Sequence, residues 1–369
     1  MTAIGMHPNH RTSAATAGDS DRSHSASLSG SGAASEHQIL HWYRGNTHTH
    51  TKNSDGDSAP DTVVRWYREH DYQFLFITDH EYVTDTAPLN ALFGASERFL
   101  VMPGQEITQW ATDPARSAAH VNSLFTSKVI WPMGNRKCMG SGCGAIVDAT
   151  VSLGDTFKTN IAAVLAAGGI PQINHPNYRW SVKPEDLYDV PNGCLLEIWN
   201  GQGRINNLGG TDDRGDTRPS AEGQWDILLS RGKVIWAVGS DDSHVFAPTD
   251  DPRAAPPGQA WIMVHAPELS SKAIGIALRD GNFYASTGLT LDNIAASSTE
   301  LSFVIVETTH GASRYVTRFI GQDGIVLAEV AGTKPAYRFQ GNETYVRASI
   351  IDSNGDRAWT QPAFLNGKR

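Results

Sequence analysis

Short runs of apolar residues recur along the chain after residue 41, and each has the length of one buried strand. These runs are residues 74–77, 99–102, 169–173, 194–199 and 233–238. Segments with the apolar spacing of helices separate them. We predict helices from Ser58, with Pro60 in the first turn, to Tyr67, and over residues 156–167 and 222–230. Alternating strands and helices predict an α/β architecture in which helical crossovers join parallel strands.

The pattern changes after Thr287 to alternating apolar and polar positions at residues 301–307, 316–320 and 345–351. This alternation predicts a small antiparallel β domain, near the usual size of a β-sandwich. A last helix is expected over residues 271–280, with Gly281 after its end. We therefore divide the chain into an α/β domain over residues 38–285 and a β-sandwich over residues 286–369.

Residues 1–37 consist mostly of Ser, Ala, Gly and His and contain almost no large apolar side chain. Such a segment cannot bury enough surface to offset the entropy lost on ordering. We expect a disordered tail.

Composition narrows the possible functions. The chain has 369 residues, 40% of them hydrophobic, and a net charge of -9 without any run of Lys and Arg, so we expect no extended nucleic-acid binding. It has no stretch of about 18 apolar residues and no signal-like N-terminus, which favours a cytoplasmic protein without a membrane partner. Its three cysteines, Cys138, Cys143 and Cys194, are expected to be ordinary thiols. A small-molecule substrate is the expected partner, and the oligomeric state stays open.

Metal-binding residue types follow the predicted strands. His48 and His50 are two residues apart, so on an extended segment they lie on one face. His-x-His alone is a weak signal, but His, Asp and Glu recur after the later apolar runs, in the positions His80, Glu106, His175, Asp242 and His244. The carboxyl ends of parallel strands converge at one mouth in a barrel, and imidazoles with carboxylates bind divalent cations there. The repetition predicts a metal cluster.

Neighbouring acidic residues leave alternatives open. Asp79 and Asp241 are candidates to orient the ligand imidazoles or, equally, to cap a turn. Glu197, in the apolar run 194–199, is a candidate proton shuttle, a residue that holds a ligand in place, or half of a salt bridge. Asp57 rivals Asp55 as a ligand, although an exposed turn residue is the better interpretation of Asp57.

These motifs resemble those of the PHP (polymerase and histidinol phosphatase) family of metallohydrolases, over about residues 41–285. The residues that match are His48, His50, Asp55, His80, Glu106, His120, His175, Asp242 and His244. Asp55 stands where some members have His. The resemblance implies a distorted (βα)7 TIM-like barrel with a site for three divalent metal ions, Zn, Mn or Fe. The segments Gly45–Thr51 and Phe283–Gly288 are more similar to the carbaryl-hydrolase-like branch.

By the same resemblance, the nine residues divide among three ions. The first ion would take His48, His50, Glu106 and Asp242; the second Glu106, His120 and His175; the third Asp55, His80 and His244. Glu106 would bridge the first two ions. The nucleophile would be a metal-bridging hydroxide, with Glu106, Asp242, His244 and Glu197 as the residues closest to the chemistry.

Three functions are compatible with such a site. The leading hypothesis is a phosphoesterase for small, nucleotide-like phosphate mono- or diesters. The second is a carbamate or aryl-ester hydrolase with the same metals, and the third is a non-catalytic, metal-stabilised binding protein. Convergent arginines would favour phosphate, and an uncharged aromatic pocket would favour a carbamate. Arg179, Trp180 and Arg204 are the candidate substrate residues.

Overall fold

The computed structural model describes residues 39–94, 98–110, 118–133, 151–307 and 313–365, and the backbone alone for 135–139 and 142–146. The predicted disordered tail lies outside the described residues. The described residues between 39 and 365 belong to one compact unit.

Each helix begins at a local signal. The helices are α1 (Pro60–Glu69), α2 (Ala87–Phe93), α3 (Leu153–Ala166), α4 (Ala221–Ser230) and α5 (Ser271–Asp280). The predicted helix start at Ser58 was wrong, because Ala59 is the N-cap of α1 and Pro60 is its first residue. Helix α3 begins earlier than predicted because the Ser152 side chain accepts a hydrogen bond from the Asp155 amide. The prediction for α5 is confirmed, with Gly281 left-handed at φ 72°.

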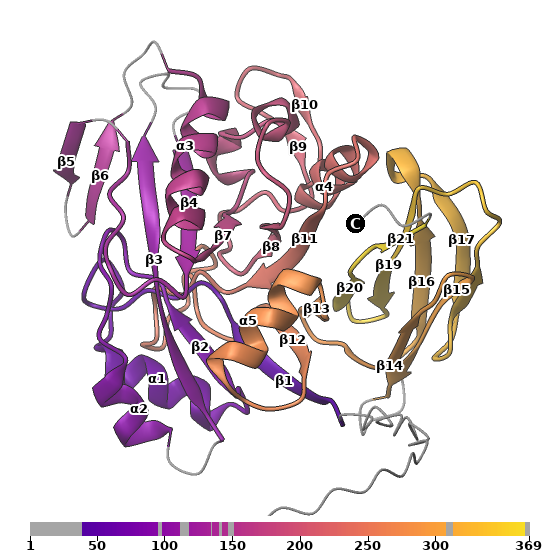
Figure 1. The fold of residues 1–369 in the computed structure, drawn as a ribbon, viewed down its shortest axis with the longest axis horizontal. Helices are drawn as coiled ribbons and strands as arrows, with labels where there is room; N and C mark the ends of the chain where they lie inside the picture. Colours follow the sequence, from indigo (N-terminus) through magenta and orange to yellow (C-terminus); the bar gives the residue numbers. More distant parts are fainter. Residues whose placement is uncertain are drawn as a thin grey trace, which may run out of the picture. The chain divides into compact units, whose positions relative to one another are not determined.

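The strands before residue 287 include every predicted apolar run. They are β1 (His41–Asn46), β2 (Phe74–Ile77), β3 (Leu100–Trp110), β4 (Ala118–Leu124), β5 (Asn135–Met139), β6 (Gly142–Ile146), β7 (Ile170–Ile173), β8 (Cys194–Asn200), β9 (Gly210–Thr211), β10 (Thr217–Arg218), β11 (Ile235–Ser240), β12 (Trp261–Ala266) and β13 (Phe283–Ser286). The large sheet has the order β11-β8-β7-β4-β3-β2-β1-β12-β13 in this part of the chain. Figure 1 shows these strands with helices α1 to α5 packed against them.

The fold is mixed α/β with a large sheet that contains parallel strands. Strands β1, β2 and β3 are parallel, as are β7, β8 and β11. The prediction of parallel strands was wrong for β4, which runs antiparallel to both β3 and β7, and for β12, which runs antiparallel to both β1 and β13. The sequence of β4, AAHVNSL, lacks a long apolar run although every residue of it is buried. The pairing order is that of an open path, so the closed barrel stays a prediction.

Backbone contacts nevertheless join the segments that follow distant strands. Thr49, after β1, forms a parallel bridge with Ser243, after β11. The His50 amide donates to the Ser243 carbonyl at 2.9 Å, and the Asp242 amide donates to the His48 carbonyl at 3.0 Å. These bonds hold the segment that follows β1 against the segment that follows β11.

The C-terminal part is antiparallel, as the alternation predicted. Its strands are β14 (Thr290–Ala296), β15 (Glu300–Val306), β16 (Tyr315–Ile320), β17 (Val326–Ala331), β18 (Ala336–Arg338), β19 (Tyr345–Asp352), β20 (Arg357–Thr360) and β21 (Ala363–Phe364). The large sheet continues from β13 through β20, β19, β16 and β17, while β14, β15 and β18 form a second sheet. Apolar residues of both sheets, among them Leu291, Phe303, Phe319 and Ile350, share one buried cluster. The predicted sandwich and the domain boundary at residue 286 stay predictions.

A buried ion-pair cluster ties β19 to α4. The Arg347 side chain is fully buried, and its Nε and Nη2 donate to the two oxygens of Asp226 at 2.7 and 2.6 Å. Its Nη1 donates to Glu222 Oε1 at 2.8 Å. The strand therefore fixes the helix that follows the long loop 201–220. Among the described residues, no helix is long and apolar enough to cross a membrane.

Candidate metal centre

The nine residues singled out in the sequence lie together in the structure. They come from six places in the chain: the segment after β1, the segment after β2, strands β3 and β4, the segment after β7 and the segment after β11. Glu106 and His120 lie within β3 and β4, on neighbouring strands, rather than after a strand end. Three groups of potential metal ligands result, and they share residues.

The first group consists of His48, His50, Glu106 and Asp242, all buried. Nε2 of His48 lies 3.3 Å from Glu106 Oε2 and 3.2 Å from Asp242 Oδ1. Nε2 of His50 lies 3.3 and 3.1 Å from the same two oxygens. Two imidazole nitrogens and two carboxylate oxygens therefore surround one point, as the ligands of a divalent cation do.

The Glu106 carboxylate faces two groups with its two oxygens. Oε2 faces His48 and His50, while Oε1 lies 2.9 Å from His120 Nδ1 and 3.3 Å from His175 Nε2. Glu106, His120 and His175 form the second group of potential ligands. A carboxylate in this position can serve two cations at once.

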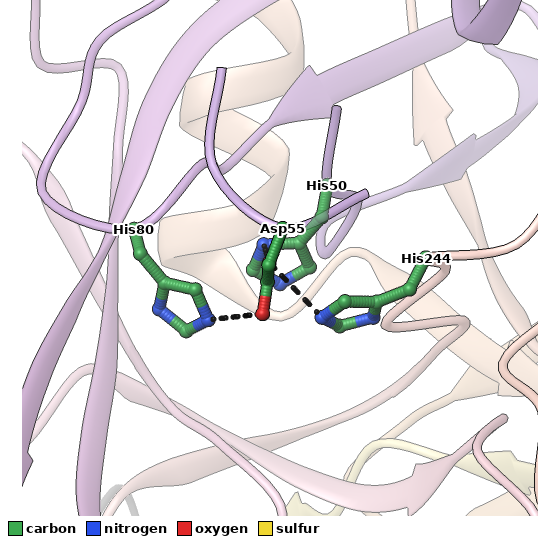
Figure 2. A group of neighbouring side chains, drawn as sticks. All are labelled: His50, Asp55, His80 and His244. Carbon is green, nitrogen blue, oxygen red and sulfur yellow. Dashed lines mark ion pairs between the residues drawn. The ribbon is translucent and has the colours of Figure 1, made fainter. Parts of the chain in front are cut away.

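The third group lies nearer the surface and is drawn in Figure 2. Asp55 Oδ1 lies 3.4 Å from His50 Nδ1 and 3.3 Å from His244 Nε2, and Asp55 Oδ2 lies 3.5 Å from His80 Nε2. The Asp55 side chain is 38% exposed, compared with 1% for Glu106. His50 belongs to this group as well as to the first, which the assignment from the resemblance did not include.

Two of the nine residues have a strained backbone. His175 and Asp242 both have positive φ, at 25° and 51°, which is costly for residues with a Cβ. Hydrogen bonds maintain both conformations: the His175 amide donates to Glu197 Oε2 at 2.6 Å, and the Asp242 amide donates to the His48 carbonyl. The strained backbone lowers the stability of the fold, and it places the side chains of His175 and Asp242 among the ligand groups.

The donor set fits divalent cations. Nε2 of His48, His50 and His120 are buried and form no hydrogen bond within the part of the chain that the structure describes. A buried polar atom without a partner costs about 1–3 kcal/mol, and two of these three, those of His48 and His50, face the oxygens of Glu106 and Asp242. Cations held by these nitrogens and oxygens would remove that cost.

The electrostatics also favour added positive charge. Burial disfavours the charged form of Glu106, yet the imidazoles of His48, His120 and His80 hold its pKa well below its usual range. Burial likewise opposes protonation of His50, but Asp242, Glu106 and Asp55 raise its pKa to about 10. The carboxylates thus draw protons onto His48, His50 and His175, whereas burial lowers the pKa of His120 to about 4. A metal ion would compete with those protons for the same atoms.

Glu197 lies behind the ligands. It is 1% exposed and does not line the cavity over the ligand groups. Its Oε1 lies 3.1 Å from Nδ1 of His48, and Ser240 donates to the same oxygen. Its Oε2 accepts from the His175 amide and, at 2.8 Å, from Asn200 Nδ2. Of the three roles considered, this geometry supports holding two ligands in place.

The other acidic residues shape loops. Asp79 accepts hydrogen bonds from Thr51, Ser54 and Thr84, and so fixes the turn that carries Asp55. Asp241 accepts from the Tyr67 hydroxyl at 2.7 Å and from the backbone amides of residues 258–260. Neither is hydrogen-bonded to a ligand imidazole, so the capping alternative describes both.

The rival ligand, Asp57, has a different position from Asp55. The Asp57 carboxylate accepts from the amides of Phe246 and Ala247, and it belongs to none of the three ligand groups among the described residues. It therefore fixes the segment that follows His244.

Three amide side chains near the ligands were not predicted. Asn174 donates to Glu106 Oε1 at 2.8 Å, and Asn200 and Gln202 donate to Asp242 Oδ2 at 3.0 and 2.6 Å. They fix the two central carboxylates. Asn174 and Asn200 stand beside predicted strand ends, which was a usable signal, whereas Gln202 lies in a long loop and had none.

A cavity of about 510 Å³ opens over the ligand groups. It is lined by Asp55, Asp57, His80, Glu81, Glu106, Thr108, Trp110, His120, His175, Tyr178, Gln202, Arg204, Asp242, His244, Val245 and Ala255. Arg204 is the single Lys or Arg among these described lining residues. Of the other predicted substrate residues, Arg179 and Trp180 line a neighbouring hollow rather than this cavity.

Comparisons with known proteins give weak similarities. No protein-family model and no curated protein sequence matches the chain. Among solved structures, a two-domain protein from Bacteroides vulgatus containing a predicted PHP-like metal-dependent phosphoesterase is similar, with 15% identity, a TM-score of 0.46, and 87% of this chain and 95% of that chain covered. An inferred metal-dependent phosphoesterase from Bifidobacterium adolescentis has 15% identity and a TM-score of 0.33, covering 54% of this chain and 87% of that one.

An amidohydrolase from Chromobacterium violaceum, with bound sulfate and no metal, has 14% identity and a TM-score of 0.33, covering 57% of this chain and 89% of that chain. Because all three similarities are this low, the functional conclusion rests on the geometry of the site.

Proposed function

We propose that this protein is a PHP-type metal-dependent hydrolase that cleaves small phosphate mono- or diesters. The observation that carries the proposal is the arrangement around Glu106: three ligand groups that share Glu106 or His50 meet under one cavity, and that cavity contains Arg204. A purely structural zinc site needs only one closed set of four ligands.

The nine ligand residues would hold up to three ions of Zn, Mn or Fe, in the groups described above. When bound, such ions lower the pKa of water and polarise phosphoryl oxygens. The distorted barrel, the C-terminal sandwich and a boundary near residue 286 belong to the same proposal.

The protein's own residues contribute positioning and charge. Asn174, Asn200 and Gln202 fix the carboxylates, and Glu197 fixes His48. Arg204 supplies a guanidinium, which binds phosphate oxygens in pairs, at the side of the cavity. His244 is 19% exposed and lines the cavity, so the outer ligand group is open to a substrate bound there.

A carbamate or aryl-ester substrate is the second candidate, and the cavity wall favours it in one respect. Trp110, Tyr178, Val245 and Ala255 give the cavity an apolar and aromatic side that suits an aryl group. The same ions would serve a carbonyl carbon, which is the chemistry expected of the carbaryl-hydrolase-like branch.

The test is turnover by the metal-loaded protein. p-Nitrophenyl phosphate, bis-p-nitrophenyl phosphate and 1-naphthyl N-methylcarbamate are compared after loading with Zn, Mn or Fe(II). We expect a phosphate ester to be the best substrate, with activity lost on chelation and restored by metal. Faster hydrolysis of the carbamate would replace the proposal with the second candidate, and turnover of none of them would favour a binding protein.

A further inference from the structure

A second hollow adjoins the cavity of the candidate metal centre. Its volume is about 440 Å³, and it is lined by Tyr178, Arg179, Trp180, Arg204, Asn206 and Asp213. We call it the side hollow. Tyr178 and Arg204 line both spaces, so a ligand bound over the metal ligands can extend past these two side chains.

One wall of the side hollow has a strained backbone. Arg179 and Trp180 are consecutive residues with positive φ, at 51° and 54°. A non-glycine residue in this region costs about 1–3 kcal/mol, so two in succession need external support. The strained pair lies four and five residues after His175, directly beside the ligand groups.

A buried amide provides that support and joins the two walls. Asn177 is fully buried, and its Nδ2 donates to the carbonyls of Asn206 and Pro219 at 3.0 and 2.9 Å. Its Oδ1 accepts from Gln224 Nε2 at 2.8 Å. The turn that carries Arg179 and the loop that carries Arg204 are therefore fixed to each other before any ligand binds.

Aromatic packing sets the position of the rings. A Cβ at Gly210 would lie 3.5 Å from the Trp180 ring, so the indole lies close against β9 at a residue without a side chain. The Arg179 guanidinium lies 5.8 Å from the centre of the Trp110 ring, which lines the main cavity, and 6.0 Å from that of Tyr178. Flat groups can stack on such rings, and guanidinium groups bind anionic oxygens.

Charge identifies the ligand class. Two guanidinium groups, those of Arg179 and Arg204, line the side hollow against one carboxylate, that of Asp213. Arg204 lines both spaces and can contact a phosphate over the metal ligands, whereas Arg179 lines only the side hollow, so positive charge extends beyond the phosphate that is cleaved.

We propose that the side hollow binds a second anionic group of the substrate, carried on a flat ring several bonds away from the phosphate that is cleaved. This proposal rests on the proposed phosphoesterase function and names its substrate class: ring-bearing phosphate esters with a distal carboxylate or phosphate.

Matched ligand pairs test it by binding, independently of turnover. The probes are benzylphosphonates whose para position carries a carboxylate on a chain of one to three methylenes, each paired with the neutral carboxamide of equal shape. Isothermal titration calorimetry with the metal-loaded protein should show about tenfold tighter binding of at least one carboxylate than of its carboxamide, as one charge-assisted contact is worth that ratio. Arg204→Gln and Arg179→Gln should each reduce the ratio toward one.

Arg214→Gln is the control, because Arg214 lies on the same loop but lines neither space, and it should keep the ratio. Equal affinities within every pair, a preference that survives both substitutions, or no binding of any phosphonate would overturn the proposal. Turnover is measured separately with phenyl phosphates that carry the same para substituents. A binding preference without hydrolysis would contradict the proposed function alone, and hydrolysis without a preference would contradict the side hollow alone.

Discussion

The ligand cluster around Glu106 and the ion-pair cluster around Arg347 are both buried, but their charges are compensated differently. Arg347 meets two carboxylates at 2.6 to 2.8 Å, and no buried polar atom of Arg347, Asp226 or Glu222 lacks a partner within the described residues. The ligand cluster instead leaves imidazole nitrogens of His48, His50 and His120 without hydrogen bonds. Removing one partner of the complete cluster would leave a buried charge uncompensated, whereas the incomplete cluster has atoms free to bind an added cation.

The largest expected effect comes from the residue shared by two ligand groups. Glu106→Gln should lower kcat/KM by at least about a thousandfold, well beyond the 10- to 100-fold typical of residues that only support ligands. The reason is that Glu106 faces His48 and His50 with one oxygen and His120 and His175 with the other. Metal content and turnover are measured together.

His80→Ala is the matched comparison, because His80 belongs only to the outer group with Asp55. It should lose less metal and less activity than Glu106→Gln. Equal losses, or a mild effect at Glu106, would count against a bridging carboxylate.

The next effect concerns the complete cluster. Arg347→Met should lower the free energy of unfolding by about 3–5 kcal/mol, because it leaves the buried Asp226 carboxylate and the partly buried Glu222 carboxylate without their cation. Denaturant unfolding measures the loss. Arg318→Met is the control, since the Arg318–Glu329 pair spans 3.0 Å on the surface and an exposed pair contributes about 0–1 kcal/mol. A similar, small loss for both variants would mean that β19 and α4 are held together by apolar packing.

Chelation separates the two clusters further. Adding metal should raise the Tm of both the unaltered protein and Arg347→Met, because cations bind the folded ligand cluster and not the unfolded chain. A Tm that changes neither with metal nor with chelator would show that the ligand cluster of the folded protein binds no metal ion.

A smaller loss of metal affinity is expected from a change at Glu197, which lies behind the ligands. Glu197→Gln should weaken metal binding by about 10- to 100-fold, because the carboxylate that contacts Nδ1 of His48 loses its charge. Glu185→Gln, at an exposed acidic residue, is the control. Unchanged metal affinity with a changed pH profile would instead assign Glu197 to proton transfer.

The smallest expected effect is a pH-dependent change in the free energy of unfolding. Burial opposes ionisation of Glu222, but Arg347 keeps its pKa below the usual range. A lowered folded pKa gives stability that is present above the unfolded pKa of about 4.3 and is lost as pH falls through the folded value. Glu222→Gln should therefore cost about 1 kcal/mol at pH 7 and progressively less below pH 4. A cost that is independent of pH would assign the effect to packing.

Local signals explain what could be predicted from the sequence. Helix α5 was predicted residue for residue, with Gly281 marking its end, and the structure shows that Ser270 caps its start. The candidate ligands could be grouped because most of them follow apolar runs, and the order of the chain places such segments together. The start of α1 was misplaced because Ser58 and Ala59 both precede Pro60, and only the structure shows that no side chain caps this helix.

Long-range contacts explain the rest. Strand β4 is buried between β3 and β7 but consists largely of small and polar residues, so its hydrophobic pattern was weak. Gln202 reaches Asp242 across forty residues, and no periodicity marks such a contact. The same holds for Arg347, whose partners on α4 lie more than 120 residues away in the chain.

The most direct test of the central claim is anomalous diffraction from crystals of the protein loaded with Zn or Mn, recorded on both sides of the metal's absorption edge. We expect peaks inside the groups around Glu106, with ligand atoms at about 2.0 to 2.3 Å, and the strongest peak among His48, His50, Glu106 and Asp242. Metal-loaded crystals without an anomalous peak between these four residues would contradict the assignment of this cluster as a metal centre.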